Sequence, residues 1–352
     1  MQIRLVLAAF AALALFGPKL AAEAAPEKVI VDNDFAGPGG SNLQSILFFL
    51  GNPRFELLGL TVVTGDAWRD EETAHVLRLL EIAGHPEVPV YNGAVFPLIN
   101  TPVRAKAWEA EFGRFPWRGA WDASDPYAVP PLKEGAPSLK PAHGTAAQFL
   151  IEQVHKYPHQ VSILAAGPLT NLALAIRLDP EFATLAKRLV FEGGVIDSNI
   201  GKVTGSTDFN TDFNLGFDPE SAHIVLTADW PSITSVSGGL GHIVPMDKAL
   251  VADVGAKDTA LTRYLVTYAW TGLPLWDEVA AAVLVDPSIV KQTITAYMDV
   301  DLANGYNYGQ AHVWSKEFAP GMGERPVTLV RAIDAAKFRA LFLQAAHQEF
   351  QQ

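Results

Sequence analysis

The sequence predicts a single α/β domain with a mainly parallel central sheet flanked by helices. Short β-branched runs alternate with helical patterns along most of the chain. Apolar residues make up 49% of the chain and charged residues 18%, which is enough apolar material for a large buried core. No internal repeat, low-complexity segment or linker divides the chain. We therefore expect one domain over residues 25–352.

The first 24 residues have the pattern of a cleaved signal peptide. Arg4 precedes an apolar stretch over residues 5–16, and small residues follow up to Ala22-Glu23-Ala24. The apolar stretch is too short to remain in a bilayer, which argues against a stable membrane anchor. We expect an exported protein, periplasmic or secreted.

The elements follow one another in a regular order. In the first part we expect strands at 29–31, 57–63 and 88–91, with helices at 43–50 and 70–83. In the second part we expect helices at 145–156 and 169–176, with strands at 161–165 and 188–191. Residues 92–142 are rich in Pro, Trp and Gly and have little periodicity, so a long loop or lid is expected there.

Carboxylates and glycines follow several of the expected strands. These segments are Asp32-Asn33-Asp34, Thr64-Gly65-Asp66, Ala166-Gly167-Pro168 and Glu192-Gly193-Gly194. Ligands of parallel sheets bind beyond the carboxyl ends of the strands. Asp and Gly also favour turns and helix caps, which explains any one segment better than it explains all of them. Convergent carboxylates suit a hard cation such as calcium or magnesium and a general base that activates water.

Two later segments add polar groups of the same kind. Asp212 and Asn214 end the stretch 206–214, in which Asp, Asn and Phe are closely spaced and suit a sugar; the alternative is a polar surface loop. Trp276-Asp277 opens an Ala-rich helix, where Asp277 is either a site residue or an acid favoured by the helix dipole.

Composition excludes several classes of function. The formal net charge is −12, which argues against nucleic-acid binding because that needs clustered Lys and Arg. The chain has no cysteine, so disulfides, thiolate metal sites and cysteine nucleophiles are excluded.

Taken together, these motifs resemble the inosine–uridine-preferring nucleoside hydrolases. The matching segments are Asp32-Asn33-Asp34, Gly167-Pro168-Leu169-Thr170-Asn171, Asp212-Phe213-Asn214 and Trp276-Asp277, in the family's order. The similarity runs from about Val29 to near the C-terminus and is weakest over 92–142. It implies a nucleoside hydrolase-like fold. The Trp-Asp pair is similar to the purine-preferring branch, since His-Asp is commoner in the family.

The resemblance implies roles for individual residues. Asp34 matches the carboxylate that binds calcium and activates the attacking water, Ala166 offers its backbone carbonyl to the metal, and Asp277 is a second carboxylate ligand. Asp212 and Asn214 match residues that hold the ribose hydroxyls. Asp66 matches a polar position near sugar and base, and Trp276 joins the substrate-binding set.

The first motif departs from the family pattern. An Asp-Asp pair is usual at the start of the following helix, but Ser41 and Asn42 stand there. Asn42 can offer one neutral amide oxygen to a cation. Calcium affinity depends on ligand charge, so calcium should bind more weakly or not at all.

Glu192 departs in the opposite direction. It stands where the family usually has a methionine beneath the ribose, and we hypothesise that it returns a negative charge as ligand or sugar contact. The alternative is an ion pair with Lys187 or Arg188. Lys202 is a further departure, near the position of an asparagine that contacts ribose.

Aromatic residues are the candidates for the base pocket. Trp108, Trp117 and Trp121 lie in the expected lid, and Trp68 follows Asp66. The family stacks the leaving base on aromatic rings, which favours flat purine-like groups. Ordinary packing is the alternative, and no histidine is an obvious acid for the base.

The expected function is hydrolysis of the N-glycosidic bond of a ribonucleoside or related N-riboside, with Asp34 as general base. The alternative is a nucleoside- or sugar-binding protein that has lost turnover, which the Ser41-Asn42 substitution favours. Hydrolysis of a different glycoside is a third option. The expected partner is a small-molecule nucleoside, and a homo-oligomer is compatible with the sequence.

Overall fold

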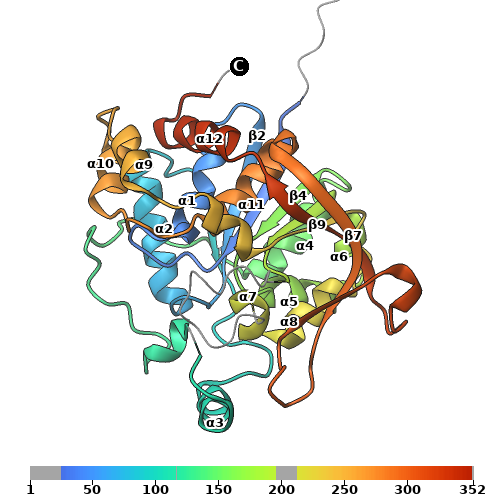
Figure 1. Cartoon of the computed structure of the whole chain (residues 1–352). Coiled ribbons are helices and arrows are strands. Elements are labelled where there is room, and N and C mark those ends of the chain that lie inside the picture. The colour runs from blue at the N-terminus through green and yellow to red at the C-terminus, as the bar shows by residue number, and fades with distance from the viewer. Residues whose placement is uncertain (1–24, 116, 196–211, 351–352) are drawn as a thin grey trace, which may run out of the picture.

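Helices surround one central sheet in the computed structural model, which describes residues 25–115, 117–195 and 212–350 (Figure 1). The strand order is β3-β2-β1-β4-β5-β6-β9-β7-β8. The pairs from β3 to β9 are parallel, and β7 runs antiparallel to both β9 and β8. The predicted α/β class with a mainly parallel sheet is confirmed. The strands are β1 (Glu27–Asn33), β2 (Phe55–Val62), β3 (Val90–Asn92), β4 (Val161–Ala165), β5 (Arg188–Glu192), β6 (Ile233–Val236), β7 (Val290–Val300), β8 (Ala311–Trp314) and β9 (Arg325–Ile333).

Two apolar layers cover the faces of the sheet. Val29 and Val31 of β1 pack into one layer and Ile30 into the other, because successive side chains of a strand point to opposite faces. The first layer is covered by α1 (Ser41–Gln44), η1 (Ser45–Phe48), α2 (Arg69–Ala83), η4 (Gly238–Ile243), α9 (Lys248–Val254), α10 (Ala260–Thr267), α11 (Trp276–Val285), η5 (Pro287–Ile289) and α12 (Ala335–His347). The second is covered by α4 (Ala146–Lys156), α5 (Thr170–Leu178), α6 (Phe182–Leu185), α7 (Phe213–Phe217) and α8 (Pro219–Leu226).

Most of the predicted elements are present with small shifts at their ends. The helix expected at 145–156 begins at Ala146, because Thr145 caps it and forms a capping box with Gln148. The helix expected at 43–50 is divided into the short α-helix α1 and the 3-10 helix η1. Ser45 lies at this junction and its hydroxyl donates to the Asn42 carbonyl, a local bond that competes with regular helix.

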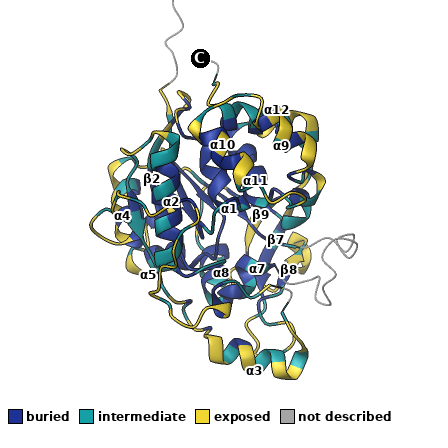
Figure 2. Cartoon of the chain, turned by 90° about the vertical axis from the view of Figure 1, so that its left-hand side faces the viewer, coloured by how far each residue is buried: buried dark blue, intermediate teal, exposed yellow. Residues whose placement is uncertain are grey.

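The prediction of a loop over residues 92–142 is wrong in part. This segment contains α3 (Pro102–Phe112) and η2 (Gly119–Asp122). Thr101 caps α3 and Pro102 opens it, so the local start signals are present. Ala105 is the buried residue of α3, and the helix is otherwise largely exposed (Figure 2). Its apolar face is short, because Trp108 and Phe112 alone join Ala105 there and pack on Tyr306, so the helical period is weak in the sequence.

Two predictions concern export. Residues 1–24 lie outside the described residues, so the signal peptide and the exported location stay predictions. Within the described residues, no helix is long and apolar enough to cross a membrane.

The topology places β1 between β2 and β4. The connection from β1 leads to β2 on one side, and the chain later returns to β4 on the other side. Parallel neighbours end at the same edge of the sheet, so Asp34, Asp66, Ala166 and Glu192 are brought to that edge by β1, β2, β4 and β5. This reversal of strand order is where ligands bind in open α/β sheets.

Candidate active site

Asp34 follows β1 and is 1% exposed. The Asp66 backbone N–H donates to its Oδ2 at 2.8 Å, and Asn42 Nδ2 donates to its Oδ1 at 2.8 Å. Two glycines lie directly against it. A Cβ added to Gly65 would be 2.1 Å from Asp34 Oδ2, and one added to Gly167 would be 2.8 Å from Oδ1. The turns after β2 and β4 therefore enclose this carboxylate, and glycine is required at both positions.

Asp32 is a structural support of the same strand. Its Oδ1 accepts hydrogen bonds from Thr61 Oγ1 on β2 and from Asn171 Nδ2 at 2.7 Å on α5. Burial raises the pKa of Asp32 to about 7. Asn171 also donates to the Val62 carbonyl and accepts from the Ala94 backbone N–H. Asp32 and Asn171 thus join strands β1 and β2 to the loop after β3.

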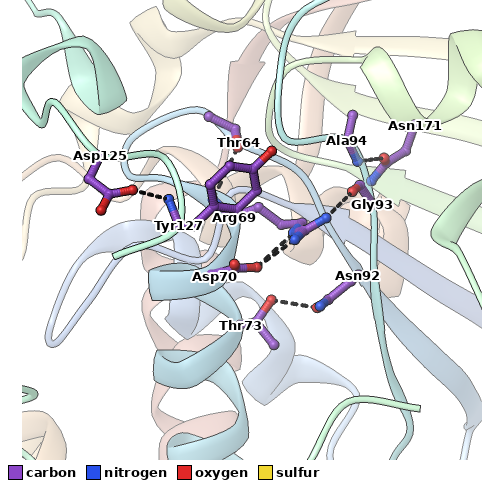
Figure 3. A network of polar contacts seen from close by, with 10 residues as sticks. All are labelled: Thr64, Arg69, Asp70, Thr73, Asn92, Gly93, Ala94, Asp125, Tyr127 and Asn171. Atoms are coloured by element: carbon purple, nitrogen blue, oxygen red, sulfur yellow. Dashed lines mark hydrogen bonds and ion pairs between the residues drawn. The ribbon is translucent and has the colours of Figure 1, made fainter. Parts of the chain in front are cut away.

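A neighbouring network fixes the turns that border the site (Figure 3). The Arg69 backbone N–H donates to Thr64 Oγ1 at 3.0 Å, and its guanidinium donates to the Gly93 carbonyl and to Asp70. Thr64 precedes Gly65 in the turn that contacts Asp34. Arg69 therefore holds the turns after β2 and β3 in place without contacting the buried carboxylates.

Asp277 enters the site from the first turn of α11. Its Oδ2 accepts from Asn33 Nδ2 at 2.9 Å, and its backbone N–H donates to Ser41 Oγ at 3.1 Å. Ser41 Oγ in turn donates to the fully buried Glu278. The two residues that replace the family's acid pair therefore have separate contacts, because Ser41 binds α11 whereas Asn42 binds Asp34.

The edge beyond β4 and β5 brings together four more of the expected residues. Asn214 Nδ2 donates to the Ala166 carbonyl at 3.1 Å and to Glu192 Oε2 at 2.8 Å. Asp212 caps α7 by accepting from the Leu215 backbone N–H. A Cβ built on Gly193 would lie 3.1 Å from Asp212 Oδ1, so Asp212 is adjacent to the end of β5.

The alternative partner for Glu192 is excluded. Lys187 and Arg188 both form ion pairs with Glu27, at the opposite end of β5. Glu192 is 6% exposed, and its Oε1 is directed toward Gly238 of η4, where an added Cβ would lie 3.4 Å away. The same Cβ would be 3.5 Å from Trp276 Cδ1, so Trp276 and Glu192 both border η4.

The structure distinguishes the four candidate tryptophans. Trp68 and Trp121 are buried in a small apolar cluster, and Trp108 stacks on Phe115 while its Nε1 donates to the Gly305 carbonyl. Trp117 is 51% exposed. Its Nε1 donates to Asp66 Oδ1 at 2.6 Å. Trp117 is therefore the tryptophan of this group that presents an open ring beside the Asp34 site.

The carboxylates of the site raise one another's pKa. Burial raises the pKa of Asp34 well above its usual range, and the charges of Asp66 and Asp277 raise it further. Burial raises the pKa of Asp277 to about 8 and that of Asp212 to about 6. Burial, followed by the charges of Asp212, Asp277 and Asp34, also raises the pKa of Glu192.

No positive side chain balances this charge within the described part of the chain. None of the ion pairs formed there involves Asp34, Asp66, Glu192, Asp212 or Asp277. Buried carboxylates without cationic partners must keep protons or bind a cation.

The donor set fits a hard cation by chemical type. Asp34 and Asp277 offer carboxylates and Ala166 a backbone carbonyl, all oxygen ligands of the kind that calcium prefers. No three His, Asp or Glu side chains among the described residues form a complete metal cluster. Asn42 directs Nδ2 at Asp34, and rotation of its amide would present Oδ1 instead. The set therefore fits a cation with fewer charged ligands than a typical calcium site.

Several contributors escaped prediction from the sequence. Asn33 holds Asp277, and Glu278 accepts from Ser41. Glu72 is fully buried on α2 and accepts from the Ala67 backbone N–H in the turn after β2. In the sequence, Glu72 is an acid in the first turn of α2, and a favourable interaction with the helix dipole explains that position as well as a role in the site does. Asp208, Asn210 and Lys202 lie outside the described residues.

Comparisons with known proteins agree on one family. The sequence model for inosine-uridine preferring nucleoside hydrolases matches residues 29–340. An uncharacterized protein of Schizosaccharomyces pombe is 31% identical over 350 residues, which cover 93% of this chain and 87% of the relative. Uridine nucleosidase 1 of Arabidopsis thaliana is 40% identical over 204 residues, covering 57% of this chain and 54% of the relative.

A solved structure shows the same fold. A plant nucleoside hydrolase superimposes with a TM-score of 0.73 at 24% sequence identity, covering 92% of this chain and 99% of the other. At this level of identity, the likeness concerns the arrangement of strands and helices.

Proposed function

The chain belongs to the inosine-uridine preferring nucleoside hydrolase family and hydrolyses ribonucleosides to base and ribose, and we propose that Asp34 is its general base. The position of the Asp34 carboxylate is the main support for this proposal. It lies beyond strand β1, is held at both oxygens by Asp66 N–H and Asn42, and is enclosed by two glycine turns. A general base needs this fixed position and a raised pKa, which burial supplies.

In the proposed reaction, Asp34 removes a proton from water as the water oxygen attacks the anomeric carbon of the ribose. The N-glycosidic bond breaks, its electron pair leaves with the nucleobase, and the nucleobase takes up a proton from solvent. Asp212 accepts hydrogen bonds from the ribose hydroxyls, and the Asn214 amide donates to them. The transition state resembles an oxocarbenium ion, and the buried negative charge of Asp277 and Glu192 stabilises its positive charge.

We propose Ca²⁺ as the cation of this site. Nucleoside hydrolases of this family depend on a metal. Asp34, Asn42, Asp277 and the Ala166 carbonyl would hold it. When bound, the cation would supply positive charge that lowers the pKa of a nearby water. The uncompensated carboxylates support this proposal, while Asn42 in place of an acid favours weak binding.

We propose that Trp117 and Trp276 border the leaving base and favour purines. Trp117 presents an open indole ring that is tied to Asp66, and Trp276 borders η4 beside Glu192. Flat, wide rings gain more contact with such aromatic walls than small ones. The name of the Arabidopsis relative mentions uridine, so base preference is the property to measure.

The substitution Asp34→Asn tests the proposed base. It keeps the shape and removes the proton acceptor, so ribose release from a ribonucleoside panel should fall by about 10³-fold. Asp258→Asn is the matched control, because Asp258 is exposed and pairs with Arg263 at the surface. Ribose release should also fall with a calcium chelator and return when calcium is added.

One substitution favours a second function. With Asn42 in place of an acid, the same site would bind a nucleoside without turnover. Calorimetric binding of inosine by the wild-type protein, without any release of ribose in the presence of calcium, would establish the binding protein. Activity equal to wild type in Asp34→Asn would exclude Asp34 as the base.

A further inference from the structure

The turn after Asp34 contributes no charge to the site. Ser41 is engaged with Glu278 and with the Asp277 backbone N–H. Asn42 donates to Asp34 through a neutral amide. Both side chains are buried, so Ser41 and Asn42 are the residues of this turn that occupy the site. Negative charge for a cation must therefore come from other elements.

Glu192 brings a carboxylate to the site from a different strand. It lies at the end of β5, two strands from β1, and shares the Asn214 amide with the Ala166 carbonyl. The Asn214 amide nitrogen lies 3.1 Å from the Ala166 oxygen and 2.8 Å from Glu192 Oε2. The groups proposed to hold the cation, here called the cation set, are Asp34, Asn42, Asp277 and the Ala166 carbonyl. The Asn214 amide thus bridges Glu192 to one member of this set, the Ala166 carbonyl.

Within the described residues, Glu192 lies near other carboxylates of the site and forms no ion pair with a positive side chain. Asp277 and Asp34 are among the groups that interact electrostatically with it, after Asp212. The neighbouring Lys187 and Arg188 are used by Glu27 at the other end of β5. A buried carboxylate in this position attracts a cation strongly, because little solvent screens it.

We propose that Glu192 supplies the negative charge that the Ser41-Asn42 segment lacks, so that cation affinity depends on β5 rather than on the turn after β1. The inference rests on the cation set of the proposed function. It makes Glu192 a determinant of binding through its charge, with no requirement that it contact the cation. A neutral residue at 192 and an acid at 42 should then compensate for each other.

Calcium titration by calorimetry tests this inference directly. Four proteins are compared: wild type, Glu192→Gln, Asn42→Asp and the double variant Asn42→Asp/Glu192→Gln. Glutamine keeps the hydrogen bond to Asn214 and removes the charge. We expect calcium affinity to fall at least about tenfold in Glu192→Gln and to return to within about threefold of wild type in the double variant.

Controls separate binding from folding. Glu111→Gln removes a charge from the exposed face of α3 and should leave calcium affinity unchanged. Urea unfolding of each protein without calcium checks that every variant is folded before titration. A rise in unfolding temperature on calcium addition gives a second readout that is independent of activity.

The outcomes also separate this inference from the proposed function. Unchanged calcium affinity in Glu192→Gln, or no recovery in the double variant, overturns the role of Glu192 whatever the activity. Hydrolysis by a wild-type protein that binds no calcium overturns the inference and leaves the hydrolase in place. Weakened calcium binding in Glu192→Gln without any ribose release supports the inference and removes the proposed function.

Discussion

Asp34 owes its position to residues that carry no functional group. Gly65 and Gly167 allow the turns after β2 and β4 to reach its carboxylate, and the Asp66 backbone N–H follows directly from the approach of Gly65. Close packing of backbone on a carboxylate fixes its orientation more firmly than flexible side chains can. At this scale, the reactive residue and the two glycines act as one unit.

Gly65→Ala should reduce kcat/KM by about 100-fold, because the added methyl would lie 2.1 Å from Asp34 Oδ2 and displace the base. Ribose release by purified protein measures the effect. Gly305→Ala is the matched control, because nothing lies within 4 Å of a Cβ added there. Wild-type kcat/KM in a folded Gly65→Ala protein would show that the carboxylate tolerates displacement.

Residue types at strand ends were predictable, and their partners were not. The positions of Asp32, Asp34, Asp66 and Glu192 follow from the strand pattern alone. Asn33 binds Asp277 across most of the chain length, and no local pattern connects the two. From the sequence alone, Glu192 could equally pair with Lys187 or Arg188. The structure excludes this, because those two residues lie at the opposite end of β5 and pair with Glu27.

Elements with several buried apolar residues were predictable, and an element with a short apolar face was not. Helix α2 buries four large apolar residues, whereas α3 has a cap at Thr101, one fully buried residue, Ala105, and a short aromatic face on Tyr306. Beyond α3 lies η2, and just before it Trp117 reaches back to Asp66. The segment expected to be a lid therefore contains folded elements and a direct contact to the site.

Trp117→Ala should raise KM for inosine and adenosine about five- to tenfold, since one open aromatic wall is lost, and change KM for uridine less. Steady-state kinetics with these substrates provides the comparison. Trp117→Phe keeps a stacking ring and loses the bond to Asp66, so it should retain most of the purine preference. Trp314→Ala on edge strand β8 serves as the control. Equal losses for purines and pyrimidines would contradict a stacking role.

The molecule as a whole carries an excess of buried acid. Asp32, Asp212 and Asp277 have pKa values raised to about 7, 6 and 8 from a usual value of 3.8. The folded protein therefore keeps protons that the unfolded chain releases near pH 4. Their contribution to stability is complete at low pH and is lost as pH rises through the raised values.

Without calcium, the free energy of unfolding should fall between pH 5 and pH 8, by about 1.4 kcal/mol per pH unit for each carboxyl between its unfolded and folded pKa. Urea unfolding in chelator at several pH values measures this slope. Saturating calcium should flatten it, because the cation binds the deprotonated carboxylates. The variant Asp277→Asn should have a shallower slope in chelator. Stability that rises across this range would contradict the raised pKa values.

The place of β1 in the sheet has a consequence for synthesis of the chain. Strands β1, β2 and β3 leave the ribosome early, but Lys28 pairs with Val161 of β4, which is made much later. Until then the nascent chain contains β1, the apolar strand that precedes Asp34, with one open edge. Long-range parallel pairing is slow, and open edges promote aggregation. Fragments that end before β4 should therefore aggregate through the open edge of β1, the strand that leads into the proposed base.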